Sequence, residues 1–310
     1  MVRNENISMR GTWCKYSKYE LKERDDITFI VPTKNSKPST YDVFDVKNEI
    51  LKDLLYIGKI FWEEPSKNMQ DQKAKEIVFS KRKDFQKLAL DFVNKYGFLG
   101  NADYLPENLD FYDDENLGVK LGYHNVVPTL DFEKHYFGFL DRDWSKTLDV
   151  NEMQYLSGKN EKNEQIGDER PEQFIFAKEY SESVYEILEF ASQIYDKMFV
   201  ISSYEKAETE DEKEMFSDFI YYSVRHTGLS MYFDEDANKM VLNLGFGTLA
   251  SIIETIFVFN ETNNRNEVRL CRYCNKPFIA TNLNSFYDKP QCRNNASVRN
   301  YRKRKKEEDK

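Results

Sequence analysis

The feature that most constrains this chain is a group of cysteines near its C-terminus. Cys271 and Cys274 form a C-x2-C pair in "RLCRYCNKPF", and Cys292 follows in "FYDKPQC". The fourth cysteine, Cys14, is distant in sequence, so the four are poorly arranged for a disulfide framework and a reducing, cytoplasmic setting is expected. Three thiols at this spacing predict a zinc site, in which a tight turn supplies two ligands and a second element supplies the others.

A zinc site of this kind needs a fourth ligand, and Asp288 stands four residues before Cys292, where a partner thiolate would fit. A carboxylate binds zinc at about 2.0–2.2 Å. The same side chain can instead cap a helix that begins at residue 288, because Pro290 suits the first turn and Gln291 has the capping-box spacing. Cys14 or water are alternative fourth ligands. The predicted zinc ligands are Cys271, Cys274, Asp288 and Cys292.

The residues around these cysteines are strongly basic, although the chain as a whole has a net charge of −9. Residues 265–306 hold twelve Lys and Arg against two acidic residues, a local net charge of +10, which leaves −19 for the rest. Such asymmetry points to a nucleic-acid-facing appendage on an acidic body. A solvated tail, or docking on an acidic partner or on the chain's own body, is the alternative reading.

A helix that continues from residue 288 would place four cations on one face, at the i, i+3, i+4 and i+7 spacing that suits phosphate contacts. Val298 and Tyr301 lie beside this face and are expected to pack on apolar residues of the finger such as Phe278 and Phe286. The predicted nucleic-acid-binding residues are Arg293, Asn294, Asn295, Arg299, Arg302, Lys303 and Lys306. The expected partner is nucleic acid, with DNA favoured over RNA.

The rest of the chain predicts a mainly α fold. Helical periodicity is clear around 46–55, 85–96, 181–199, 211–226 and 249–259, and 229–244 is typical of a short β-hairpin. Gly97 is a natural stop for the helix at 85–96. Residues 1–40 show only weak periodicity. The most apolar window, 240–259, contains Asn243 and Glu254, so it predicts a strand end and a buried helix, and no membrane span is expected.

These patterns predict two domains. A mostly helical body covers 1–262, with two subdomains around an exposed linker at 157–173. A treble-clef-like zinc finger with a basic C-terminal helix covers 263–310.

The C-terminal stretch "CRYCNKPFIATNLNSFYDKPQCRNNASVRNYRKRKK" resembles the CGNR-type zinc fingers and related treble-clef fingers of bacterial and phage proteins. Cys271, Cys274 and Cys292 match that pattern, as do the Arg–Asn pair and the basic helix that follow. Asp288 stands in place of the third cysteine, and Asn295 where the family has arginine. The resemblance implies a helical N-terminal domain and a regulator that binds DNA.

Enzyme motifs are absent from the sequence. The three histidines are not paired at i+3 or i+4, and there is no phosphate-binding glycine loop. The acidic stretch 109–118 is more typical of a solvated loop than of a cation site. We therefore expect a non-enzymatic prokaryotic or phage nucleic-acid-binding protein, a transcriptional regulator. The alternative is a protein-interaction module in which the zinc finger is a structural staple, and an enzyme that uses the acidic loop is the third reading.

Overall fold

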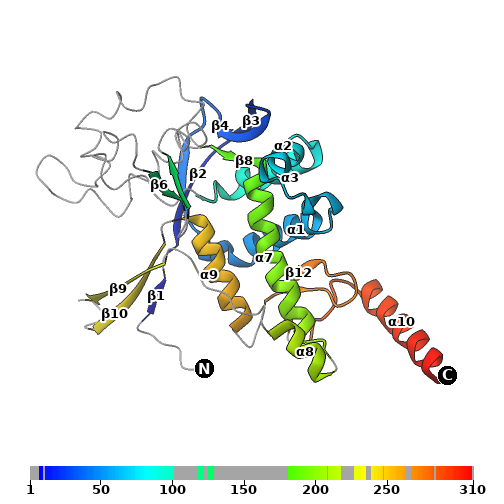
Figure 1. Ribbon diagram of the computed structural model, residues 1–310. Coiled ribbons are helices and arrows are strands. Elements are labelled where there is room, and N and C mark those ends of the chain that lie inside the picture. Colours follow the sequence, from blue (N-terminus) through cyan, green and yellow to red (C-terminus); the bar gives the residue numbers. More distant parts are fainter. Residues whose placement is uncertain are drawn as a thin grey trace, which may run out of the picture. The chain divides into compact units, whose positions relative to one another are not determined.

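The computed structural model describes residues 7–9, 11–100, 118–121, 125–128, 181–207, 209–217, 227–234, 239–246, 248–262, 267–282 and 284–308. The predicted linker at 157–173 and the acidic residues 110–115 lie outside these ranges. In the described part the fold is mainly helical, as predicted, with small and mostly antiparallel strands (Figure 1). None of the described helices combines the length and the apolar character needed to cross a membrane.

The chain divides into two compact units that each combine distant segments. Unit 1 comprises Met1–Asp45, Asp71–Ile187 and Arg225–Ile252, and unit 2 comprises Val46–Gln70, Leu188–Val224 and Ile253–Lys310. The predicted division into 1–262 and 263–310 is a different one and stays a prediction.

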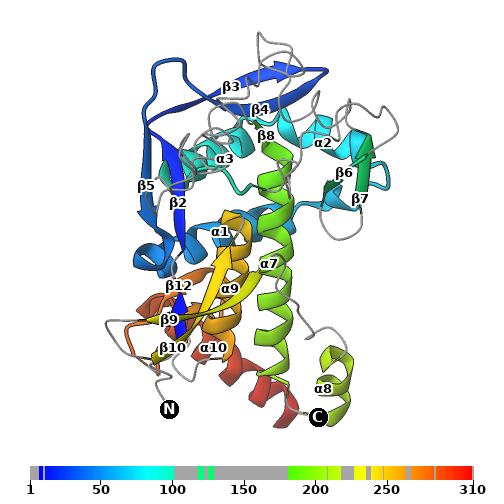
Figure 2. The same cartoon turned by 90° about the vertical axis from the view of Figure 1, so that its left-hand side faces the viewer.

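Unit 1 contains most of the strands (Figure 2). β2 (Thr12–Tyr16) pairs with β5 (Pro38–Asp42), and β3 (Tyr19–Arg24) pairs with β4 (Ile27–Pro32), which also pairs with β8 (Glu182–Ser183). β9 (Thr227–Asp234) and β10 (Lys239–Phe246) form the predicted hairpin, with β1 (Ile7–Met9) parallel to β10. β6 (Gly118–Leu121) pairs with β7 (Asn125–Pro128).

The strands between residues 7 and 42 were not predicted, because their periodicity is weak. β3 is short of apolar residues and lies at the edge of its sheet, while β4 is a continuous buried run. The turn between them places Asp25 and Asp26 at φ values of 50° and 68°, the left-handed region that two-residue hairpin turns require and that Asp tolerates. The expectation of a single hairpin in a helical body is therefore wrong for this segment.

Two helices of unit 1 pack on these strands. α2 (Gln72–Ser80) begins after Asp71, whose carboxylate accepts the N–H of Ala74 at 3.1 Å. α3 (Lys83–Tyr96) ends, as predicted, at Gly97, which has a φ of 89°. The chain then reaches Gly100, where the buried Glu182 carboxylate accepts two backbone N–H groups at 2.9 and 2.6 Å.

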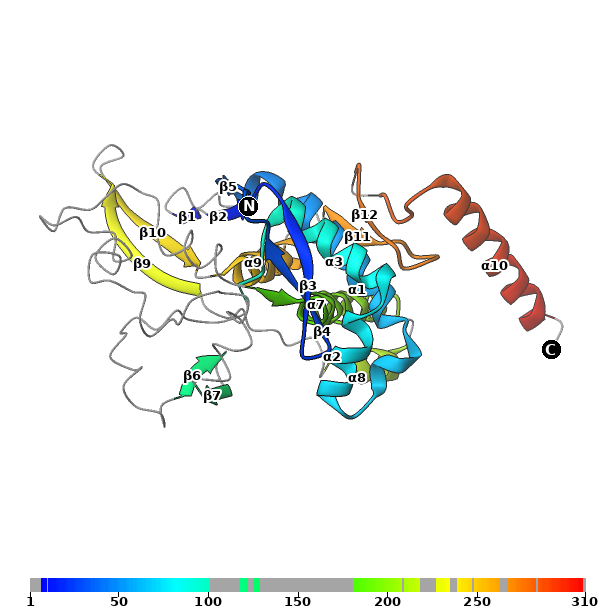
Figure 3. The same cartoon turned by 90° about the horizontal axis from the view of Figure 1, so that it is seen from above.

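Unit 2 contains the longest helices and the cysteine hairpin. Its elements are α1 (Lys47–Trp62), the 3-10 helix η2 (Pro65–Asn68), α7 (Val184–Tyr204) from Leu188 onward, α8 (Glu210–Ser217), α9 (Leu249–Thr262) from Ile253 onward, β11 (Val268–Leu270), β12 (Pro277–Ile279) and α10 (Pro290–Glu308). A 3-10 turn, η1 (Val43–Val46), precedes α1. Figure 3 shows α10 extending away from the other helices of this unit.

Candidate metal centre

The first two cysteines lie in the turn between β11 and β12, which form a short antiparallel hairpin. The N–H of Cys271 donates to the carbonyl of Lys276 at 2.9 Å, and the N–H of Asn275 donates back to the carbonyl of Cys271 at 2.8 Å. Asn275 has a φ of 54°, which an asparagine tolerates better than most residues. These bonds set the turn, so both thiols project from one rigid knuckle.

The third cysteine comes from the first turn of α10 and completes a cluster of three sulfurs. The Sγ atoms of Cys271, Cys274 and Cys292 all lie within 4.8 Å of one another. The Sγ atoms of Cys274 and Cys292 are 3.8 Å apart, and two thiolates bound to one tetrahedral zinc at about 2.3 Å each are about 3.8 Å apart. Cys271 and Cys292 are buried and Cys274 is half-buried. The three thiols could therefore hold a metal ion, as predicted.

Local hydrogen bonds and burial separate the pKa values of these thiols. Burial raises the pKa of Cys271, but N–H groups of Asp288, Cys274 and Tyr273 donate to its sulfur and bring the net pKa below the ordinary value. Burial and the neighbouring sulfurs raise the pKa of Cys292 to about 12. A bound cation would offset the repulsion among three thiolates, and metal binding would then release their protons.

Asp288 lies beside the cluster. Its Oδ1 is 3.8 Å from the Sγ of Cys292, while a zinc-bound carboxylate oxygen and thiolate are about 3.6 Å apart. The group of mutually close ligand atoms consists of the three sulfurs, without this oxygen. The role of Asp288 as a metal ligand therefore remains a prediction.

The helix that follows starts later than the prediction. α10 begins at Pro290, not at residue 288, and the N–H of Cys292 donates to the carbonyl of Lys289 at 3.0 Å. Among the hydrogen bonds of the described residues, no N–H of the first turn of α10 donates to the carboxylate of Asp288. Asp288 therefore precedes the capping position of α10 by one residue, and the predicted cap at the start of this helix is not seen in the described part of the chain.

Other residues of unit 2 hold the hairpin in place. The side-chain amide of Asn260 in α9 bonds both the N–H and the carbonyl of Val268, at 2.9 and 2.8 Å, and so continues the strand pairing of β11. The hydroxyl of Tyr195 in α7 donates to the carbonyl of Asn275 at 3.3 Å. The Nδ2 of Asn48 in α1 donates to Glu267 at 2.6 Å. The hairpin is thus supported by three helices.

The predicted nucleic-acid-binding residues all lie on α10. Arg293, Asn294, Asn295, Arg299 and Arg302 are exposed, as are Arg304 and Lys305, while the side chains of Lys303 and Lys306 lie outside the described part.

The predicted packing of Val298 and Tyr301 on the finger is wrong. These side chains are 50% and 65% exposed, and after Cys292 the only described side chain of α10 that is buried is Ala296. The rest of the helix has no apolar face, because its few apolar residues are separated by Arg, Lys and Asn.

Sequence reasoning did not find the residues that support the hairpin. Asn260, Tyr195 and Asn48 are ordinary helix residues, and their contacts with the knuckle join positions far apart in the chain. The one local signal was Asn275, since an asparagine directly after a C-x2-C pair suits a left-handed turn.

Comparisons of the chain with protein-family models, with curated proteins and with solved structures give no match. The resemblance to CGNR-type fingers therefore rests on the local motif alone, and the function must be argued from the residues.

Proposed function

We propose that this chain is a prokaryotic or phage nucleic-acid-binding protein, a non-enzymatic regulator, whose zinc-bound C-terminal finger presents α10 to the phosphates of DNA. Two parts of unit 2 support the proposal. The sulfurs of Cys274 and Cys292 have the separation expected for two ligands of tetrahedral zinc, and the cluster ties the start of α10 to the hairpin through Cys292. The metal would hold the helix at a set angle to the hairpin, and no chemical step is assigned to it.

The observation that carries the proposal is the exposure of the cations on α10. Arg293, Arg299 and Arg302 are exposed, and among the described residues no carboxylate forms an ion pair with a cation of this helix. Like charges at i and i+4 destabilise an isolated helix, so a stripe of this kind gains stability from a polyanion. The phosphates of a duplex groove supply that charge at a matching spacing.

Binding to short duplex DNA at several salt concentrations tests the proposal. Contacts to about four phosphates predict a slope of roughly −3 to −4 in a plot of log affinity against log salt concentration. Replacing Arg299, Arg302 and Lys303 by glutamine is expected to abolish binding and to leave the unfolding transition unchanged. The matched control replaces three exposed lysines of α3: Lys83, Lys87 and Lys95.

Two outcomes would count against the proposal. If the α10 variant binds DNA as tightly as the wild type, the helix is not the binding surface. If both proteins fail to bind DNA or RNA but bind an acidic polypeptide through α10, the chain is a protein-interaction module and the finger is its structural staple.

A further inference from the structure

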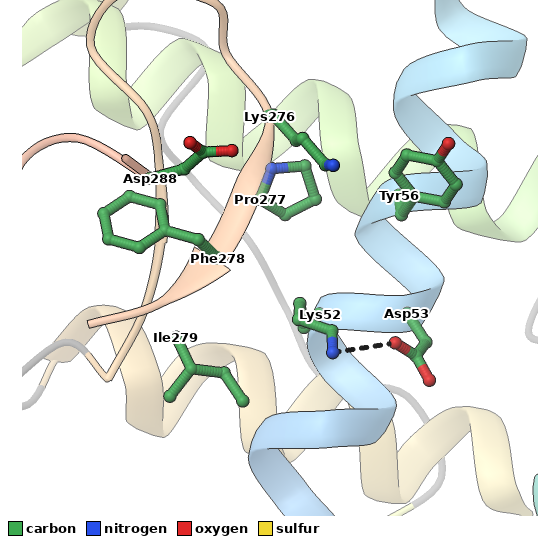
Figure 4. Close-up of a pocket in the computed structure, with 8 residues that line it drawn as sticks. All are labelled: Lys52, Asp53, Tyr56, Lys276, Pro277, Phe278, Ile279 and Asp288. Atoms are coloured by element: carbon green, nitrogen blue, oxygen red, sulfur yellow. Dashed lines mark ion pairs between the residues drawn. The ribbon is translucent and has the colours of Figure 1, made fainter. Parts of the chain in front are cut away.

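A hollow of about 460 Å³ lies beside the metal centre in unit 2 (Figure 4). One wall is α1, which contributes Lys52, Asp53 and Tyr56, and the other is β12 with Phe278. Lys276 and Asp288, on either side of β12 in sequence, complete it. The hollow is open to solvent, and its volume is in the range of pockets that accept small groups of nucleotide size.

The hollow is lined by two lysines, two aspartates, two aromatic residues and the apolar residues Pro277 and Ile279. Tyr56 is 40% exposed, and the Nζ of Lys276 is 5.5 Å from the centre of its ring. The Nζ of Lys52 pairs with Asp53 at 3.2 Å. Two lysines against two aspartates leave no net charge, so the hollow itself has no long-range attraction for any polyanion, and such attraction must come from the cations of α10.

We propose that this hollow receives an unpaired base of the nucleic acid that α10 binds. The inference rests on the proposed function and adds the form of nucleic acid. A nucleotide is matched by the mixture of groups: its phosphate by the lysines, its base by the ring of Tyr56, and its amino and imino N–H groups by the carboxylates. A peptide of one charge sign would leave half of these groups without a match.

The position of Asp288 connects the hollow to α10. It lines the hollow and lies two residues before Pro290, where the helix begins. Lys289 and Arg293, between the hollow and the cationic part of α10, are exposed. Because these two residues follow Asp288 closely in sequence, we expect a strand that binds them to reach the hollow. A paired base within a stack cannot enter it, so binding should favour a single strand, loop or bulge over a continuous duplex.

The test compares a fluorescent hairpin with an unpaired loop against the same stem without unpaired bases, using the full-length protein. The wild type is expected to bind the looped form more tightly. Tyr56→Ala is expected to lower affinity for the looped form by roughly fivefold to a hundredfold, the range for loss of one stacked base, and to leave affinity for the stem unchanged. Lys276→Ala is expected to lower affinity for the looped form by less than Tyr56→Ala does.

The controls are matched substitutions elsewhere in unit 2. Tyr204→Ala removes an exposed tyrosine of α7, and Lys213→Ala removes a half-buried lysine of α8 that pairs with Glu210; neither residue lines the hollow. Both variants should retain the preference for the loop. Equal affinity of the wild type for the two nucleic acids, or an unchanged preference for the loop in Tyr56→Ala, would overturn the inference. Polyglutamate is a competitor of the other class. If it displaces the looped hairpin from the wild type but not from Tyr56→Ala, the hollow binds an acidic peptide and the inference is also overturned.

Failure of this inference is distinct from failure of the proposed function. Without a base in the hollow, the stem would still bind through Arg299, Arg302 and Lys303, and neutralising these residues would still abolish binding. Without nucleic-acid binding by α10, neither probe would depend on those three residues.

Discussion

The cysteine hairpin and α10 adjoin in sequence, yet they are stabilised in different ways. The hairpin receives hydrogen bonds from Asn260, Tyr195 and Asn48, on three helices of its unit. Beyond Cys292, the described part of α10 has one buried side chain, that of Ala296. The hairpin is therefore held by the tertiary structure, while α10 depends on the sulfur cluster at its start and on whatever binds its surface.

This difference separates the two roles that a finger can have. A supported hairpin provides a fixed base for the metal and for the hollow beside it. An exposed cationic helix provides a surface that is free to bind a polyanion without loss of packing. Substitutions under the hairpin should therefore change stability, while substitutions along α10 should change binding alone.

The largest effect is expected from breaking the link between the two regions. Cys271→Ser removes a buried thiolate ligand, and metal affinity should fall by at least about a hundredfold, since even residues that only support ligands contribute ten- to a hundredfold. α10 should lose helicity, because its charges repel and it has no apolar face. Metal analysis and circular dichroism measure both changes. Cys14→Ala, in β2, is the control and should retain the metal.

Disturbing the close approach of α1 to α7 is expected to have the next largest effect. A Cβ at Gly58 in α1 would lie 2.1 Å from the carbonyl oxygen of Ala191 in α7, and backbone on both sides cannot move independently. Gly58→Ala should lower the free energy of unfolding by about 3–4 kcal/mol, as in severe overpacking. In Gly11→Ala the nearest atoms belong to Phe44, at 3.0 Å, so a smaller loss is expected in urea unfolding. Equal losses would contradict this prediction.

The half-buried carboxyl of Glu261, next to the hairpin, should make stability depend on pH. Burial raises the pKa of Glu261 from its ordinary value of 4.5 to about 7, despite the hydrogen bond from Asn260 and the charge of Arg269, which lower it. The folded protein therefore holds this proton between pH 4.5 and 7 while the unfolded chain releases it, and stability falls as pH rises through this range.

Glu261→Gln should remove this loss. The variant should match the wild type at pH 4 and be more stable by about 2–3 kcal/mol at pH 8, which urea unfolding at each pH measures. Glu20→Gln, at an exposed position in β3, is the control and should show no such change with pH. If Glu261→Gln is no more stable than the wild type at pH 8, ionisation of the Glu261 carboxyl does not lower the free energy of unfolding, and the prediction is wrong.

Substitutions of Asp288 test whether its carboxylate is a metal ligand between the hairpin and α10. Asp288→Ala should weaken metal binding by about ten- to a hundredfold if one of its oxygens is a ligand, and Asp288→Cys should strengthen it, since thiolate is a softer donor than carboxylate. Metal competition against a chelator measures both. Unchanged affinity in the alanine variant would show that water or another residue completes the site.

The smallest effect is expected on the exposed side of α10. Val298→Ala and Tyr301→Ala should each change the free energy of unfolding by less than about 0.5 kcal/mol, because both side chains are at least half exposed. A loss of more than 1 kcal/mol in urea unfolding would show that α10 packs on another surface in solution, as in the original prediction of a finger core around these residues.

Local patterns were sufficient for several elements. The helices α3 and α9 follow the apolar periodicity, and the φ of Gly97 matches its predicted role as a helix stop. The β9–β10 hairpin follows from alternation around a turn. The strands near the N-terminus did not, because β1 and β4 pair with the distant strands β10 and β8, and the charged edge strand β3 has no apolar alternation.

The sequence alone determined that three thiols and a dense run of cations would lie near the C-terminus, because residue type and short spacing are local properties. Only the tertiary structure decided that the sulfurs meet, that Asn260 and Tyr195 support the knuckle, and that Tyr56 faces the same hollow as Asp288. Such contacts join residues up to about 230 positions apart, and their geometry depends on how helices pack, which periodicity within one segment does not specify.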